Sequence, residues 1–124
     1  MAMAYDNDNI FACILRREIP AEKVYEDEHV LAFHDIGKLA PVHVLVIPKG
    51  AYISIDDFSE RASDAELVAY VRAVGKVARK LGVAKTGYRV VTNCGTDANQ
   101  EVSHFHSHIF GGRKLGGVRP RHSG

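Results

Sequence analysis

Short apolar runs separated by prolines and charged residues fill the first third of the chain. The first run predicts a short helix over residues 10–17, with four apolar side chains on one side: Ile10, Phe11, Ile14 and Leu15. Pro20 ends this helix, because its ring removes a backbone donor. Apolar runs at 24–26 and 30–33 flank a charged stretch, which predicts a β-hairpin. Residues 42–47 are almost continuously apolar and predict a strand buried on both faces.

The clearest helix signal begins at Ser63. Ser63 and Glu66 stand three residues apart and predict a capping box, in which each side chain satisfies a free backbone N–H at the start of the helix. Apolar residues then recur at spacings of four and three, which predicts one buried stripe: Leu67, Val71, Val74, Ala78 and Leu81. Gly82 follows where a left-handed residue commonly ends a helix.

Two further strands are predicted after this helix, over residues 87–92 and 102–110, with a polar loop between them. Gly95 supplies an unusual backbone angle in that loop. Short strands around one long helix predict an α+β fold: a mainly antiparallel five-stranded sheet, one long helix and a short N-terminal helix. We expect a single domain over residues 9–116, between a flexible segment 1–8 and an irregular tail 117–124.

Composition agrees with one globular domain, since the chain has 124 residues, of which 46% are hydrophobic and 25% charged. A net charge of +1 argues against a general nucleic-acid-binding protein. The two cysteines, Cys13 and Cys94, come without a secretory signal or an apolar run long enough for a membrane span. We therefore expect a cytoplasmic protein with reduced thiols and no membrane contact.

Three histidines alternate in the last predicted strand, at His104, His106 and His108. Every second side chain of a strand points to one face, so we expect the three imidazoles to project together. Three interpretations compete. The histidines could form a metal site, one neutral imidazole could act as a nucleophile, or all three could be structural residues with satisfied hydrogen bonds at a sheet edge. At ~3.3 Å per residue the outer pair is roughly 13 Å apart, too far to share one ion with ~2.0–2.1 Å bonds. A metal would need another ligand, for which His43 is available.

Residues elsewhere in the chain favour a nucleoside phosphate as ligand over a lone metal. Asn93 offers an amide, the loop from Gly95 to Glu101 can aim backbone N–H groups at an anion, and Asp35 can accept two sugar hydroxyls. Several apolar side chains could form a slot for a flat base: Phe11, Ile14, Phe33, Ile36 and Leu45.

The segment from His104 to Phe110, HFHSHIF, resembles the His-φ-His-φ-His-φ-φ signature of the histidine triad (HIT) superfamily. Three more blocks occur in the order seen in its histidine triad nucleotide-binding branch: AFHDI at 32–36, APVHVLVIPK at 40–49 and YRVVTNCG at 88–95. The resemblance covers roughly residues 9 to 116.

The resemblance implies hydrolysis of the P–N bond of purine nucleoside 5′-phosphoramidates. His106 matches the nucleophile, His108 and His43 match histidines that contact the phosphate, and His104 matches the residue whose carbonyl supports the nucleophile. The resemblance further implies candidate substrate-binding residues at the base slot, the ribose and the phosphate: Ile10, Phe11, Ile14, Phe33, His34, Asp35, Ile36, Leu45, Asn93, Asn99, Gln100 and Glu101. It also implies a homodimer and no cofactor.

Five positions depart from the pattern of this branch. Glu101 stands where a serine is common, Asn99 where a glycine is common, and Ser107 where an apolar residue is usual. Asn9 and Ala12 occupy the positions of a zinc-binding cysteine pair, so we expect no structural zinc. A dinucleoside polyphosphate hydrolase and a non-catalytic nucleotide-binding regulatory or scaffold protein remain alternative functions.

Overall fold

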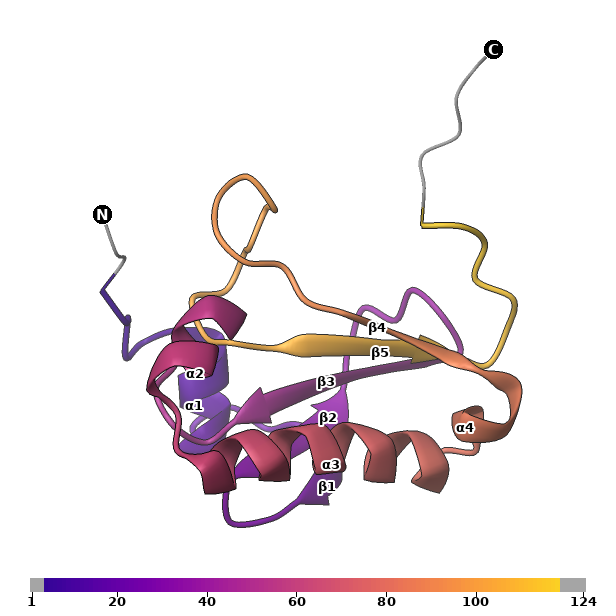
Figure 1. Ribbon diagram of the computed structural model, residues 1–124, viewed down its shortest axis with the longest axis horizontal. Coiled ribbons are helices and arrows are strands. Elements are labelled where there is room, and N and C mark those ends of the chain that lie inside the picture. Colours follow the sequence, from indigo (N-terminus) through magenta and orange to yellow (C-terminus); the bar gives the residue numbers. More distant parts are fainter. Residues whose placement is uncertain (1–3, 119–124) are drawn as a thin grey trace.

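The computed structural model describes residues 4–118, which form one antiparallel sheet and four helices (Figure 1). The strands are β1 (Lys23–Glu26), β2 (Val30–His34), β3 (Val42–Pro48), β4 (Tyr88–Val91) and β5 (Ser107–Gly111). They lie in the order β1-β2-β3-β5-β4, and every neighbouring pair is antiparallel. The helices are α1 (Ile10–Leu15), α2 (Ile55–Arg61), α3 (Asp64–Lys80) and α4 (Val83–Thr86). The predicted α+β class and five-stranded sheet are confirmed.

Alternation along the strands divides the apolar residues between the two faces of the sheet. One face packs against α3, which lies across it in Figure 1, and this core includes four fully buried strand residues: Val30, Ala32, Val44 and Val46. The opposite face carries a smaller cluster in which Phe11 of α1 covers the strands: Phe11, Leu31, Phe33, Leu45 and Ile47. The strand predicted over 42–47 is therefore buried on both faces.

The long helix begins as predicted, with both hydrogen bonds of the capping box between Ser63 and Glu66. Its predicted stripe is wrong at Val71, which is 73% exposed. Tyr70, Ala73 and Val77 are buried instead, next to the half-buried members of the predicted stripe. Two apolar rows run side by side on this helix, and the sheet covers the row that carries the aromatic ring.

The last strand begins later than predicted, at Ser107 rather than at residue 102, so His104 and His106 lie in the segment that leads into it. The alternation of faces still holds, because Phe105, Ser107 and Ile109 are buried toward α3. Neither α2 nor α4 is predicted from the sequence. No helix within residues 4–118 has the length and apolar character needed to cross a membrane.

Part of the predicted terminal segments lies outside the described residues: 1–3 at the N-terminus and 119–124 of the irregular tail. The domain boundaries at 9 and 116 stay a prediction.

Candidate active site

A cleft of about 630 Å³ opens on the sheet face that carries the smaller apolar cluster. Its floor follows from strand register: Phe33 of β2 pairs with Leu45 of β3, Leu45 pairs with His108 of β5, and His108 pairs with Val91 of β4. Residues paired across neighbouring strands point to the same face of the sheet. One row across the sheet therefore provides the apolar floor of the cleft and also the imidazole of His108. All four side chains line the cleft.

Most of the candidate residues from the sequence meet in this cleft. The apolar end is lined by α1 and β2 together with the predicted slot residues: Ile10, Phe11, Ile14, Phe33, Ile36 and Leu45. The polar lining includes these candidates: His34, Asp35, Asn93, Asn99, Glu101, His106 and His108. Apolar side chains and a group of imidazole, amide and carboxylate side chains therefore line the same cleft.

Three candidates from the sequence lie behind the cleft wall. Gln100 holds its own loop, because its side chain accepts from the Gly95 N–H and donates to the carbonyls of Ile53 and Val102. His43 and His104 are 2% and 0% exposed, and they contact the cleft histidines His108 and His106.

His106 is held in one tautomer by the backbone. Its Nδ1 lies 2.7 Å from the carbonyl oxygen of His104, and a carbonyl can only accept a hydrogen bond, so Nδ1 carries the proton. The lone pair therefore sits on Nε2. Burial lowers the pKa of His106, which keeps the ring neutral at pH 7. The hydroxyl of Thr92 donates to the His106 carbonyl at 2.7 Å and ties this segment to the end of β4.

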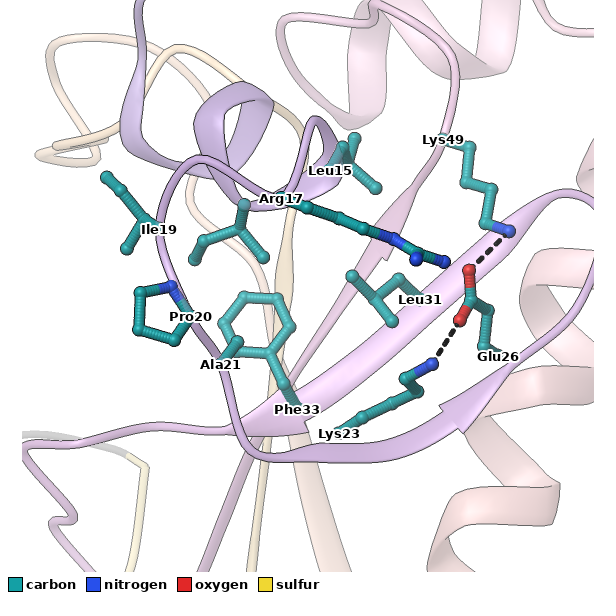
Figure 2. Close-up of a pocket in the computed structure, with 11 residues that line it drawn as sticks. Leu15, Arg17, Ile19, Pro20, Ala21, Lys23, Glu26, Leu31, Phe33 and Lys49 are labelled. Carbon is teal, nitrogen blue, oxygen red and sulfur yellow. Dashed lines mark hydrogen bonds and ion pairs between the residues drawn. The ribbon is translucent and has the colours of Figure 1, made fainter.

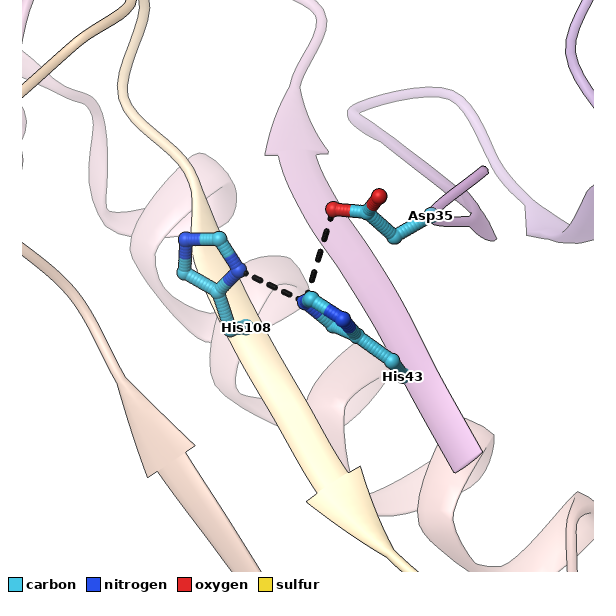
Figure 3. Close-up of side chains that lie close together, drawn as sticks. All are labelled: Asp35, His43 and His108. Carbon is cyan, nitrogen blue, oxygen red and sulfur yellow. Dashed lines mark hydrogen bonds and ion pairs between the residues drawn. The ribbon is translucent and has the colours of Figure 1, made fainter. Parts of the chain in front are cut away.

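His108 belongs to a second hydrogen-bonded group, with His43 and Asp35, that draws on three segments of the sheet (Figure 3). The Leu39 N–H donates to Nδ1 of His43 at 3.2 Å, so the His43 proton lies on Nε2. This Nε2 is 2.9 Å from Nδ1 of His108 and 3.4 Å from a carboxylate oxygen of Asp35. His108 thus accepts at Nδ1 and carries its own proton on Nε2.

The protonation of this group is controlled mainly by burial. Burial, reinforced by the neighbouring His106 and His43, lowers the pKa of His108 to about 4. Burial also lowers the pKa of His43, against the opposing effect of the Asp35 carboxylate. Both imidazoles are therefore neutral at pH 7, and a proton taken up with a bound anion would be stabilised by Asp35.

One group within residues 4–118 has a geometry that could hold a metal ion. It consists of Asp35, His43 and His108, whose ligand atoms lie within 4.8 Å of one another. A metal on Nε2 of His43 would displace the proton that this nitrogen shares with His108. The expectation that no metal binds stays a prediction, which metal analysis of the purified protein can check.

The loop between β4 and β5 carries two residues with left-handed backbone angles, Gly95 at φ 82° and Asn99 at φ 59°. Asparagine tolerates this conformation better than most residues, which explains why it can stand where a glycine is common. Ser107, another departure, points away from the cleft and bonds to the Tyr70 hydroxyl at 2.8 Å. Ser107 therefore acts in core packing rather than in the cleft.

Figure 2 shows a second cleft, of about 570 Å³. It lies beside the first and shares five lining residues with it: Ile14, Ile19, Pro20, Ala21 and Phe33. Lys23 and Lys49 both reach the Glu26 carboxylate, at 2.6 and 2.7 Å. These hydrogen bonds lower the pKa of Glu26 to about 2. The second cleft has no histidine or cysteine in its lining within residues 4–118, so we place the reactive chemistry in the first cleft.

Many known proteins resemble this chain in sequence and in fold. A family model described as the HIT domain matches residues 16–115. The chain is 62% identical to a HIT-like protein of Azospirillum brasilense over 116 residues, 94% of this chain and 95% of that protein. It is 41% identical to an Escherichia coli protein named purine nucleoside phosphoramidase over 109 residues, 88% of this chain and 91% of that protein. A solved histidine triad protein from Clostridium difficile superposes with a TM-score of 0.80 at 44% identity, covering 94% of this chain and 100% of that one.

Proposed function

The chain belongs to the HIT domain family of hydrolases, and from this premise we propose that it cleaves purine nucleoside 5′-phosphoramidates at the P–N bond. The observation that carries the proposal is the cleft in which an apolar slot meets a neutral histidine with a free Nε2 lone pair. The similarity to a purine nucleoside phosphoramidase supports the choice of substrate.

In the proposed complex the purine lies in the apolar slot, against Phe11 and Phe33. The Asp35 carboxylate receives the ribose hydroxyls at the edge of the cleft, and the Asn93 amide faces the phosphate. This arrangement brings phosphorus to His106, because the polar lining adjoins the apolar slot.

The proposed reaction has two steps: transfer of the nucleotidyl group to His106 and its hydrolysis by water. Nε2 of His106 attacks phosphorus, the P–N bond breaks, and its electron pair stays on nitrogen, which takes a proton from the protonated His43–His108 pair. Water then returns a proton to that pair as its oxygen attacks phosphorus. The P–His106 bond breaks, its electrons return to Nε2, and the nucleoside 5′-monophosphate leaves. The Asp35 carboxylate stabilises the pair while it is protonated, before the first step and after the second.

The charges in the cleft favour an amine over a polyphosphate as leaving group. Within residues 4–118, Asp35 and Glu101 line the cleft and no lysine or arginine does. A pyrophosphate or polyphosphate leaving group would therefore meet carboxylates without a balancing cation, at a cost in Coulomb energy. An amine carries no such penalty, which supports a phosphoramidase over the alternative of a dinucleoside polyphosphate hydrolase.

Hydrolysis of adenosine 5′-phosphoramidate, followed by ³¹P NMR, tests the proposal, with diadenosine tetraphosphate as the competing substrate. We expect the wild-type protein to prefer the phosphoramidate and His106→Ala to lose more than roughly 10³-fold in rate while still binding AMP in calorimetry. His29→Ala, a histidine that lines neither cleft described above, is the matched control and should keep the wild-type rate. AMP binding without hydrolysis by the wild-type protein would indicate a binding module and overturn the proposal.

We also propose that the chain forms a homodimer and resides in the cytoplasm. β4 is an edge strand, and its Tyr88 and Val90 are 39% and 46% exposed, which supports pairing with a second copy. Free Cys13 and Cys94 agree with a reducing compartment. Light scattering at micromolar concentration should give twice the 13.6 kDa chain mass, and a mass of one chain would contradict the dimer.

A further inference from the structure

Tyr5 reaches from the segment before α1 to the buried histidine behind the cleft. Its hydroxyl lies 2.6 Å from Nδ1 of His104, and the two rings meet edge to face with centroids 5.6 Å apart. His104 has no exposed surface, so this hydroxyl substitutes for water at a nitrogen that solvent does not reach. Tyr5 precedes the stretch 16–115 that matches the family model.

The hydrogen-bond partners of His104 assign a direction to this contact. Nε2 of His104 lies 2.8 Å from the carbonyl oxygen of Pro48 and must donate to it. A neutral imidazole then has its lone pair on Nδ1, so the Tyr5 hydroxyl is the donor. The His104 carbonyl in turn accepts the Nδ1–H of His106 at 2.7 Å. Tyr5 is thus connected to the proposed nucleophile through a single residue.

We propose that Tyr5 is a positioning residue for the reaction: by holding the ring of His104 it fixes the carbonyl that orients His106 toward phosphorus. This inference rests on the proposed function of His106. Two ring contacts, to the Tyr5 hydroxyl and to the Pro48 carbonyl, hold His104 from opposite sides of its imidazole. Removing the Tyr5 hydroxyl leaves the buried lone pair of Nδ1 without a partner, and His104 can satisfy it only by moving.

The competing explanation is that Tyr5 simply anchors the N-terminal segment. That segment has a separate anchor at Asp6, whose carboxylate accepts from the Asp8 N–H at 2.9 Å and whose carbonyl accepts from the Asn9 side chain at 2.7 Å. Asp6→Ala removes the first of these two bonds and keeps the second, which the backbone makes, so it weakens the segment without touching His104. Tyr5→Phe does the opposite, because it keeps the ring packing and removes only the hydroxyl.

The experiment measures kcat and KM for adenosine 5′-phosphoramidate in the full-length wild-type, Tyr5→Phe and Asp6→Ala proteins. Loss of one hydrogen bond is expected to lower kcat of Tyr5→Phe by roughly 3- to 10-fold. KM should stay unchanged, because Tyr5 does not line the cleft. Asp6→Ala should keep the wild-type kcat. An unchanged kcat in Tyr5→Phe, or an equal loss in both variants, would overturn the positioning role.

Imidazole ¹⁵N NMR of the substrate-free protein gives a readout that does not depend on activity. Tyr5→Phe should shift the Nδ1 resonance of His104 and also the Nδ1–H resonance of His106, whereas Asp6→Ala should shift neither. A change confined to His104 would show that the contact ends there and would overturn the inference. If the wild-type protein has no phosphoramidase activity, the proposed function fails, and the His106 resonance still decides whether Tyr5 acts on it.

Discussion

His104 should make the fold sensitive to acid, and the size of the effect can be worked out from its environment. Burial lowers the pKa of His104 from 6.5 to about 4, so the unfolded chain takes up a proton at this residue before the folded chain does. The corresponding stability is fully present above about pH 6.5 and is lost as the pH falls from there to about 4. Between pH 7 and pH 5 the two pKa values correspond to a loss of about 2 kcal/mol in the free energy of unfolding.

The assay is urea unfolding of wild-type and His104→Gln proteins at pH 7 and pH 5, at one protein concentration. The variant is less stable at both pH values, but it has no imidazole at this position to protonate. Its loss of stability between pH 7 and pH 5 should therefore be about 2 kcal/mol smaller than that of the wild type. His29→Gln serves as the control, because His29 is not fully buried. Equal pH dependence in wild-type and His104→Gln proteins would refute the argument that His104 is held neutral by burial.

Two further predictions concern single side chains. Glu101→Gln should raise kcat/KM for diadenosine tetraphosphate by about 3- to 10-fold relative to adenosine 5′-phosphoramidate, because it removes one carboxylate from the cleft lining; an unchanged ratio would show that Glu101 does not select the leaving group. Tyr70→Phe should lower the free energy of unfolding by about 1–3 kcal/mol in urea, since the hydroxyl donates to the Val46 carbonyl and also contacts Ser107 Oγ in the core; a loss below measurement error would mean that both groups find other partners.

Some helices and strands are predictable from the sequence because a single local pattern specifies each of them. The capping box at Ser63 and the continuous apolar run of β3 depend on neighbouring residues alone, and both are confirmed. The buried row of α3 was not fully predictable. Its sequence carries two adjacent apolar rows, and only contact with the sheet decides that Tyr70 is covered while Val71 is exposed.

The sequence predicts a start of β5 that is too early, because the alternation of apolar residues begins before the pairing of β5 with β3. The β3–β5 ladder reaches no further than the pair Val46 and Ser107. Beyond it, the Pro48 carbonyl accepts from the side chain of His104 rather than from a strand backbone. Alternation therefore predicted the faces of the triad correctly but not the extent of the strand.

The composition of the cleft was predictable from the sequence through the family resemblance, but its hydrogen-bond network was not. The tautomers depend on the Leu39 N–H and on the carbonyls of Pro48 and His104, and backbone groups leave no signal in a sequence. Tyr5 was missed for a related reason: it is an isolated aromatic residue in a polar segment, and no spacing rule connects it with His104.

If His106 is the nucleophile, its Nε2 bonds to phosphorus during turnover, and this bond can be trapped. The protein is mixed with adenosine 5′-phosphoramidate, quenched within milliseconds under alkaline conditions that preserve phosphohistidine, and analysed by peptide mass spectrometry and ³¹P–¹⁵N NMR. We expect an adenylyl group on His106, attached at Nε2, that disappears as AMP accumulates. AMP release with no adduct on His106, or an adduct on another residue, would contradict it.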